Sequence, residues 1–502
     1  MNTLDYAILI AYLMGVLALG AVFARRQRDE DEFFLAGRSM HWFPLGLSVM
    51  VTAFSAMNYT AFSGEVFGHG LYVVLCVPVF VLVAIPVIKI VMPFYHRMRL
   101  CSAYEYLEKR FDVRVRCLAS GLFILWRTAW AATALFVPCK VMSHLTGVNL
   151  HLLIVLAGVI ATAYTMAGGM RAVMWTDVLQ FFVLFGGIVL GVAVAARSTP
   201  GGFSGMLRLS ADAGLMKPFY PFDPAMLSPD PRIRITLWSA LIGTFTAFLA
   251  RYGADQVVVQ RYFTARSLKT AQRGFHLNYI SAITSLLLLA LLGFAIHAHA
   301  ATNGLLGSLG PRPLPYFSAF VRSLPAGLTG LLVAGLFAAT MSSVDSGVNS
   351  CCAAFVTDFY DRFRDAGRPT GPRLMRLLTL ALGAIVTGTA LTVDQWGTLF
   401  QIAAKIINGL GSPLLALFLL GMFSRRANSL GMLLGGLLGT AWSVFVSCSI
   451  EGLALHYYAV VNLAGTLLAC YLCSLIAGPM CGRSSPEQLS WMWRAQKSQT
   501  TG

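Results

Sequence analysis

Long apolar stretches separated by short polar connections run along the whole chain. Segments of about 17–25 apolar residues match the thickness of the hydrocarbon core of a bilayer. The pattern predicts thirteen membrane helices, near residues 4–24, 43–66, 71–95, 116–145, 149–167, 174–196, 233–252, 276–300, 325–356, 377–393, 397–422, 428–448 and 455–477. The fold class is therefore predicted to be an all-α polytopic membrane protein.

The number of segments allows a symmetry at the level of helices. Two sets of five helices, at 43–196 and 233–422, fit two repeats of opposite topology, because an odd number of helices inverts the second copy. The other parts are one helix with its link at 1–42, an external loop at 197–232, two further helices at 423–477 and a cytoplasmic tail at 478–502.

Basic residues predict the orientation of the chain. An odd number of spans places the two termini on opposite sides, and the connections rich in Lys and Arg are expected to be cytoplasmic. By this rule roughly 26 basic residues fall on one side and about 7 on the other. The N-terminus is expected outside and the C-terminus in the cytoplasm of a cell (inner or plasma) membrane. The basic connections include Arg25, Arg26, Arg110, Arg114, Arg116, Arg261, Arg266, Lys269 and Arg273.

Composition agrees with a membrane protein. The 502 residues are 57% hydrophobic and 12% charged, with a mean hydropathy of +0.70. The formal net charge of +16 does not indicate nucleic acid, because the basic residues lie in short clusters between apolar segments. The ten cysteines show no metal-ligand spacing, and no phosphate-binding loop or zinc-protease histidine pair occurs, so we expect no enzyme activity.

A polar stripe interrupts the ninth apolar segment. Ser342, Asp345, Ser346 and Asn349 recur at spacings of three and four, which places them on one face of a helix. An Asp at the centre of a membrane helix costs roughly 2.5–3.5 kcal/mol, so it marks a candidate functional site. Stacked side-chain oxygens suit a small hard cation. A helix-packing face would explain the serines as well, but it would not explain the acid.

The second apolar segment is also polar at its centre. Thr52, Ser55 and Asn58 lie where lipid would be costly, and a helix that unwinds there exposes carbonyl groups. Broken helices of this kind supply carbonyl oxygens to sodium in secondary carriers. The alternative is that the hydroxyls bond back to their own helix.

Of the further charges inside apolar segments, two are candidates for a functional role. Asp177 is a few residues from the predicted cytoplasmic end of its segment, where it serves either as an ion ligand or as an ordinary solvated or capping acid. Arg127 either balances an acid or binds an anionic substrate.

Several motifs together resemble those of the sodium/solute symporter family, which includes the sodium/glucose cotransporters. The resemblance extends from about residue 4 to about residue 475, and the serine-rich ninth segment is part of it. The other motifs are FFLAGRSM at 33–40, AGGMRAVMWTD at 167–177, DQVVVQRY at 255–262, GSP at 411–413 and GMF at 421–423.

The resemblance implies a LeuT-like core of two inverted five-helix repeats, with one extra helix before it and two after it. It also implies Na⁺ as the coupling ion. In the matching positions, the ligands of the principal sodium site are the carbonyl groups of Val51, Phe54 and Ala339 and the hydroxyls of Ser342 and Ser343.

A second sodium site, present in some members of the family, matches Asp177, Ser342, Asp345 and Ser346. Asp345 stands where those members carry a serine, so the extra acid either strengthens this site or binds a proton. GEVF at 64–67 is most similar to the branch that carries iodide, monocarboxylates and vitamins, which implies a small organic anion. Asn58 matches a substrate-binding position, and Thr246 and Arg127 are further candidate solute contacts.

We therefore expect a sodium-coupled secondary active symporter that imports a small polar or anionic organic solute by alternating access. Its expected partners are the solute, sodium ions and the lipid bilayer. Two alternatives stay open: a proton-coupled carrier that uses Asp345 or Asp177, and a sensor or channel-like protein that has kept the fold.

Overall fold

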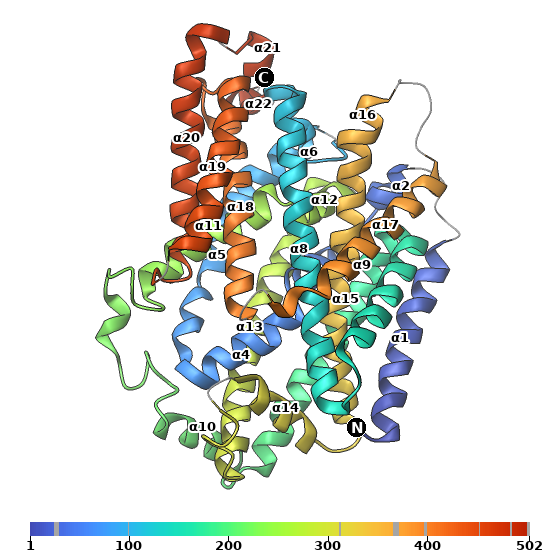
Figure 1. Ribbon diagram of the computed structural model, residues 1–502, viewed down its shortest axis with the longest axis vertical. Coiled ribbons are helices and arrows are strands. Elements are labelled where there is room, and N and C mark those ends of the chain that lie inside the picture. The colour runs from blue at the N-terminus through green and yellow to red at the C-terminus, as the bar shows by residue number, and fades with distance from the viewer. Residues whose placement is uncertain are drawn as a thin grey trace.

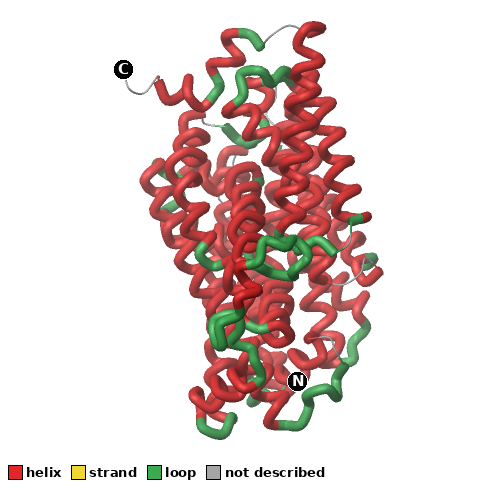
Figure 2. Tube along the Cα trace, turned by 90° about the vertical axis from the view of Figure 1, so that its left-hand side faces the viewer, coloured by secondary structure: helices red, strands yellow, loops and turns green. Residues whose placement is uncertain are grey.

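The computed structural model describes the whole chain except residues 25–29, 99, 311–312, 365–370, 396–398, 451, 482–483 and 499–502. The described residues are mostly helical and form no strand; two isolated bridges, Met40 with Ala265 and Phe219 with Phe222, are the only β pairing among them. The predicted all-α class is confirmed. Figure 2 shows the long helices in red along the vertical axis of the molecule.

The helices differ widely in length, from single turns to the 49 residues of α9. The α-helices are α1 (Thr3–Ala24), α2 (Glu30–Leu35), α3 (Trp42–Ala53), α4 (Ala56–His69), α5 (Val79–Pro86), α6 (Met92–Met98), α7 (Glu105–Arg110), α8 (Val113–Thr146), α9 (Leu150–Ser198), α10 (Gly202–Asp212), α11 (Thr244–Ala254), α12 (Gln256–Thr264), α13 (Leu268–Thr302), α14 (Pro313–Ser323), α15 (Leu328–Phe355), α16 (Asp361–Phe363), α17 (Pro372–Ala390), α18 (Leu399–Phe423), α19 (Ser429–Ser449), α20 (Tyr457–Cys481), α21 (Pro486–Ser490) and α22 (Trp493–Ser498). Short 3₁₀ or π segments are η1 (Ala36–Arg38), η2 (Leu71–Cys76), η3 (Val87–Val91), η4 (Pro224–Leu227), η5 (Ser239–Gly243), η6 (Val356–Tyr360) and η7 (Val393–Gln395).

Fewer than thirteen helices meet a length and hydropathy test for membrane spans. Among the described residues there are nine, or ten if the bent pair α3 and α4 forms one span. The other predicted segments correspond to shorter apolar helices, Leu150–Met166 and Gly409–Phe423, and to α11 with its preceding π segment η5. Bends divide the α3–α4 pair and α9, and the π segment η5 precedes α11, so three of these apolar stretches are not single regular helices.

The buried helix α15 lies at the centre of the molecule (Figure 1). Of its most apolar window, 94% is buried inside the protein, against 22% for α1. Helices α1, α3, α8, α9 and α17 pack around it. The polar stripe on α15 therefore faces other helices, as an intramembrane acid requires.

A bend at Gly169 divides α9 into the two segments that the sequence predicts. Its φ of 54° lies in a region that side chains rarely adopt, so a glycine suits the position. The bend allows residues on both halves of α9, Tyr164 and Asp177 among them, to reach the polar part of α15.

Three basic residues assigned to cytoplasmic connections are instead buried. Arg261 lies on α12, a short helix in which every residue is buried, and Arg110 and Arg116 are also inside the protein. Arg116 pairs with Glu108 at 2.6 Å and with Asp358 at 2.8 Å. The charge count along the sequence treats these side chains as solvated, but the folded chain uses them to hold elements together.

Candidate functional site

The second apolar segment is broken where its polar residues lie. Helix α3 ends at Ala53 and α4 begins at Ala56, and the two axes differ by 62°. Phe54 and Ser55 between them are extended. The break has a local cause, because Ser55 and Asn58 form a capping box at the start of α4, in which Ser55 N donates to Asn58 Oδ1 at 3.0 Å.

Two residues matched to the principal sodium site, Val51 and Phe54, lie at this break, and the other three lie on α15. Both α3 and α4 pack on α15, which carries Ala339, Ser342 and Ser343, all buried. The Val51 carbonyl accepts a hydrogen bond from Phe54 N at 2.9 Å, and the Ala339 carbonyl accepts one from Ser343 Oγ at 3.2 Å. Ser342 Oγ makes no hydrogen bond among the described residues. The break, the carbonyl groups and a spare hydroxyl form an oxygen-rich region suited to a small cation.

A cluster of buried charges lies next to that region. We call it the charge cluster; its charged members are Arg261, Asp177 and Asp345, all fully buried. Arg261 Nη2 donates to Asp177 Oδ2 at 3.2 Å, to Ser346 Oγ at 2.6 Å and to Thr52 Oγ1 at 2.7 Å, while its Nε donates to Ser48 Oγ at 2.7 Å.

Asp345, the second acid of the charge cluster, is held by two hydroxyl groups. Tyr164 donates to Asp345 Oδ2 at 2.8 Å and Ser346 Oγ donates to Asp345 Oδ1 at 3.2 Å. Ser342 lies next to Asp177, yet Asp177 Oδ1 makes no well-formed hydrogen bond. With two acids and one arginine, the cluster has a formal charge of −1 when both acids are ionised, and a buried charge of this kind requires a proton or a cation.

The structure brings the four residues matched to a second sodium site together, but it adds Arg261 to them. Ser346 bonds to the guanidinium and to Asp345, and Asp177 forms an ion pair with the same guanidinium. The sequence contains one signal for this arrangement, since Arg261 lies in the DQVVVQRY motif, but hydropathy alone assigns it to a loop.

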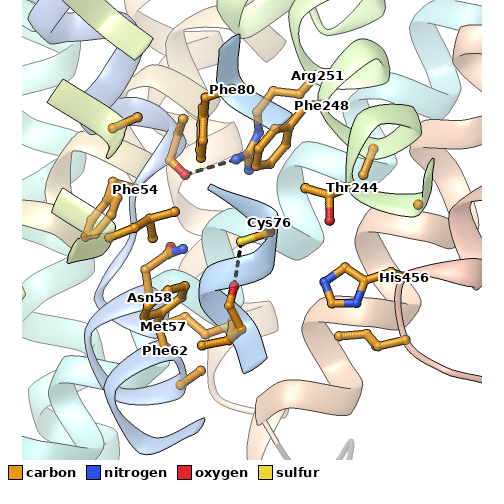
Figure 3. A pocket seen from close by; sticks show the side chains of 18 of the residues that line it. Phe54, Met57, Asn58, Phe62, Cys76, Phe80, Thr244, Phe248, Arg251 and His456 are labelled. Carbon is orange, nitrogen blue, oxygen red and sulfur yellow. Dashed lines mark hydrogen bonds between the residues drawn. The ribbon is translucent and has the colours of Figure 1, made fainter. Parts of the chain in front are cut away.

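A cavity of about 250 Å³ adjoins the break on the α4 side. Figure 3 shows Phe54, Phe62, Phe80 and Phe248 around it, together with a few polar groups. These polar lining residues are Asn58, Glu65, Thr244, Arg251, Tyr252 and His456. The combination of an apolar wall and a few polar groups is typical of sites for small molecules.

Arg251 is the basic residue of this lining that the sequence prediction missed. Its Nη1 donates to the Ala53 carbonyl at 3.1 Å, and its guanidinium lies 5.6 Å from the ring centre of Trp130. No ion pair joins Arg251 to an acid among the described residues. The only sequence signal was an arginine near the end of the apolar segment 233–252.

The candidate solute contacts fall in different places. Asn58 lines the cavity, although its side-chain oxygen also caps α4. Thr246 is not part of the lining, and its hydroxyl donates to the Ile242 carbonyl at 2.9 Å. Thr244 lines the cavity instead, and its hydroxyl has no hydrogen-bond partner among the described residues. Arg127 lies outside the lining.

Arg127 instead balances an acid. Its Nε donates to Asp255 Oδ1 at 3.0 Å, and a second contact joins the same two side chains. Both side chains are buried, at 2% and 0% exposure, so they form a closed ion pair at the junction of α11 and α12. Of the two roles considered for Arg127, the geometry favours charge balance.

Comparisons with known proteins identify relatives that are sodium-coupled transporters. The sodium/sialic acid symporter NanT of Aliivibrio fischeri is 28% identical over 94% of this chain and 93% of its own length. The sodium-dependent multivitamin transporter of Oryctolagus cuniculus is 30% identical over 89% of this chain and 70% of its own, and the sodium-coupled monocarboxylate transporter 1 of Mus musculus is 29% identical over 88% and 72%.

Solved structures give the same result. A Na⁺-coupled sialic acid symporter, solved in a substrate-bound outward-open state, superposes with a TM-score of 0.86 at 26% identity over 96% of this chain and 99% of its own. A nucleobase-cation-symport-1 family transporter shares the fold with a TM-score of 0.58 at 14% identity over 91% and 97%. The sequence profile of the sodium:solute symporter family matches residues 33–439. The relatives are transporters, and this chain belongs to the sodium:solute symporter family.

Proposed function

We propose that this protein is a sodium-coupled symporter that imports a small organic anion by alternating access. The observation that carries the proposal is the break between α3 and α4, which has the buried oxygens of α15 on one side and a cavity with an arginine on the other. The proposed cation site and the proposed anion site would thus meet at one break in the backbone. The relatives that carry sialic acid, monocarboxylates and vitamins with sodium support the same reading.

Sodium is proposed to bind at the carbonyl groups of Val51, Phe54 and Ala339 and the hydroxyls of Ser342 and Ser343. Ser342 Oγ is unengaged by protein groups, so it is available to a cation without losing a hydrogen bond. The Val51 carbonyl, which accepts one hydrogen bond from Phe54 N, keeps a second lone pair for a ligand. Sodium bound there would tie α3 and α4 to α15.

The solute is proposed to be an anion with an apolar body. Arg251 supplies a guanidinium that can hold a carboxylate through two parallel hydrogen bonds. Asn58 and Thr244 offer further polar contacts, and the rings of Phe80 and Phe248 would cover the apolar part. Thr246 and Arg127, which the sequence also suggested, lie outside this lining and are not included.

A second cation is proposed to accompany the charge cluster. Asp177, Ser342, Asp345 and Ser346 lie together there, and their excess acid charge attracts either a second sodium ion or a proton. The unsatisfied Asp177 Oδ1 and Ser342 Oγ mark where such a cation would find ligands.

The membrane topology is proposed to follow the family pattern. Thirteen helices, with two inverted five-helix repeats at 43–196 and 233–422, would account for the nine long apolar helices, the bent pair and the shorter apolar helices. The start of α1 and the helices α21 and α22 lie at opposite ends of the molecule (Figure 1), which supports termini on opposite sides of the membrane; we propose that the basic connections then make the N-terminus external and the C-terminus cytoplasmic. The setting is the cell membrane.

Coupling follows from which state each ligand prefers. A ligand shifts the balance of outward-facing and inward-facing states only through its different affinity for the two. Because linkage is reciprocal, sodium should raise the affinity for the solute by the same factor as the solute raises the affinity for sodium.

Transport by purified protein in lipid vesicles tests the proposal. We expect an inward sodium gradient to drive accumulation of at least one member of a panel of pyruvate, nicotinate, biotin and N-acetylneuraminate, with little uptake of glucose. Failure of a sodium gradient to drive uptake of any of them would contradict sodium-coupled anion symport. Uptake in sodium-free buffer at acidic external pH would indicate proton coupling, and saturable binding without accumulation would indicate a sensor.

A further inference from the structure

Arg251 connects the cavity to the break in the second span. Its Nη1 donates to the carbonyl of Ala53, the last residue of α3, at 3.1 Å (Figure 3). Ala53 directly precedes Phe54 and follows Val51 by two positions, so the guanidinium bonds to a carbonyl that neighbours, along the chain, two of those proposed for sodium. One side chain therefore reaches both proposed ligand sites.

Within the part of the chain that the structure describes, no acid pairs with Arg251. Two buried arginines of this region have acid partners, Arg127 with Asp255 and Arg261 with Asp177, whereas Arg251 is half-buried. Glu65 lines the same cavity, but both of its oxygens accept hydrogen bonds from Arg234 at 2.6 Å. Arg251 uses one of its N–H groups on Ala53 and stacks on Trp130, which leaves most of its donors available.

Two cations are then attracted to the same end of α3. The C-terminus of a helix carries a partial negative charge and carbonyl groups without intrahelical partners. A guanidinium bonded there repels a sodium ion nearby, and the repulsion is strong where water is scarce. A carboxylate in the cavity would pair with Arg251 and cancel this repulsion.

We propose that Arg251 is the residue through which solute and sodium sense each other. Without solute, it acts as a tethered cation at the end of α3 and weakens sodium binding; with solute, it binds the carboxylate and leaves the carbonyl groups to sodium. The inference deepens the proposed symport of an organic anion and rests on it. It also explains why the carrier would select anions, since only an anion removes the competing charge.

Sodium binding in the absence of any carboxylate provides the decisive test. The melting temperature of purified full-length protein is measured against sodium chloride concentration, with choline chloride holding the ionic strength constant, because a ligand of the folded state stabilises it. In the Arg251→Gln variant we expect the half-effective sodium concentration to fall several-fold below that of the wild type. An unchanged or higher concentration would overturn the inference, because an arginine that merely held α3 in place would weaken sodium binding when removed.

Three further variants isolate the cause. Arg251→Lys keeps the charge but loses the planar fork, so we expect wild-type sodium binding with reduced carboxylate uptake. Lys89→Gln removes one exposed positive charge elsewhere, and we expect no change in sodium binding. If it lowered the half-effective sodium concentration as much as Arg251→Gln, the effect would come from overall charge, and the proposal would be refuted. Arg251→Met keeps the volume without the charge, and it carries the same prediction as Arg251→Gln should that variant not fold.

The outcome is separable from the fate of the proposed function. If wild-type vesicles show no sodium-driven uptake of any member of the panel, the symport proposal fails. If they do, and Arg251→Gln keeps both the sodium dependence and the anion uptake of the wild type, the role of Arg251 fails alone.

Discussion

Two arginines, ten positions apart along the chain, are held in opposite ways. Arg261 on α12 donates hydrogen bonds to Ser48, Thr52, Asp177, Ser346 and a carbonyl of its own helix, and no part of it is exposed. Arg251 on α11 is half-buried, faces a cavity and makes one hydrogen bond to the described residues, to a backbone carbonyl. The first is fixed by many partners, whereas the second can exchange its one partner for another.

The contrast shows how one fold combines a rigid part with a movable part. A buried charge that is fully hydrogen-bonded is costly to disturb, so the charge cluster ties α3, α9, α12 and α15 together. A buried charge with unused donors favours a ligand that satisfies them. The break between α3 and α4 lies between these two regions, next to the part that can move.

Removing the fixed arginine should have the largest effect. Arg261→Gln leaves Asp177 and Asp345 buried without a cation, so we expect a loss of about 3–5 kcal/mol of stability, seen as a large drop in the melting temperature of the purified protein. The double variant Arg261→Gln/Asp177→Asn removes one orphaned acid and should recover part of that loss. An unchanged melting temperature in Arg261→Gln would remove the distinction between the two arginines.

The excess acid of the charge cluster should affect the number of cations carried with each solute molecule. Asp345→Ser leaves Asp177 and Arg261 as a neutral pair, so we expect one fewer cation to be carried per solute molecule. Each charge moved is worth about 2.3 kcal/mol per 100 mV of membrane potential, so the variant should accumulate solute less at a given voltage. The number of cations carried per solute molecule is measured from the voltage at which net flux reverses. Tyr164→Phe, which keeps the acid, is the control. An unaltered ratio in Asp345→Ser would exclude Asp345 from coupling.

Ser342 lies beside both regions, and its loss should have a more moderate effect. We expect Ser342→Ala to raise the sodium concentration for half-maximal transport roughly tenfold, which corresponds to about 1.4 kcal/mol, because one proposed ligand is lost. The maximal rate at saturating sodium should change little. A sodium dependence equal to that of the wild type would remove Ser342 from the site.

The smallest effect is expected at Glu108, an acid outside the membrane-spanning helices. It forms an ion pair with the buried Arg116. Burial would raise the pKa of Glu108, but hydrogen bonds from Arg116 and Arg362 outweigh burial and hold the pKa below its ordinary value of 4.5. Its stabilising effect is therefore present above that pH and is lost as the pH falls through the lowered pKa. We expect Glu108→Gln to cost less than about 1 kcal/mol near neutral pH. The difference in melting temperature from the wild type should vanish in acid; a difference that persists there would have another cause.

Much of the fold could be predicted from the sequence, because lipid allows few alternatives. The broken second span follows from Thr52, Ser55 and Asn58 in an apolar segment, and the central place of α15 follows from the acid on it. The number of membrane spans was harder to predict, because length and hydropathy alone do not show where a helix bends.

The candidate site was harder to predict because its parts meet only in three dimensions. Arg261 seemed to be a loop residue, because the sequence does not show that the connection after α11 folds back into the protein as α12. The π segment η5 precedes α11 and changes which face looks into the cavity, so Thr244 rather than Thr246 lines it. Arg127 and Asp255 are 128 positions apart, a distance over which no local pattern reveals a pair.

The capping role of Asn58 also bears on how the solute range of such a carrier could change. Asn58 faces the cavity, yet it also supports the first turn of α4. A substitution chosen to suit a different solute at this position would usually uncap the helix at a cost of about 1 kcal/mol. New specificity is therefore more accessible through Thr244, whose hydroxyl supports nothing else, and directed evolution of this transporter should accumulate changes there first.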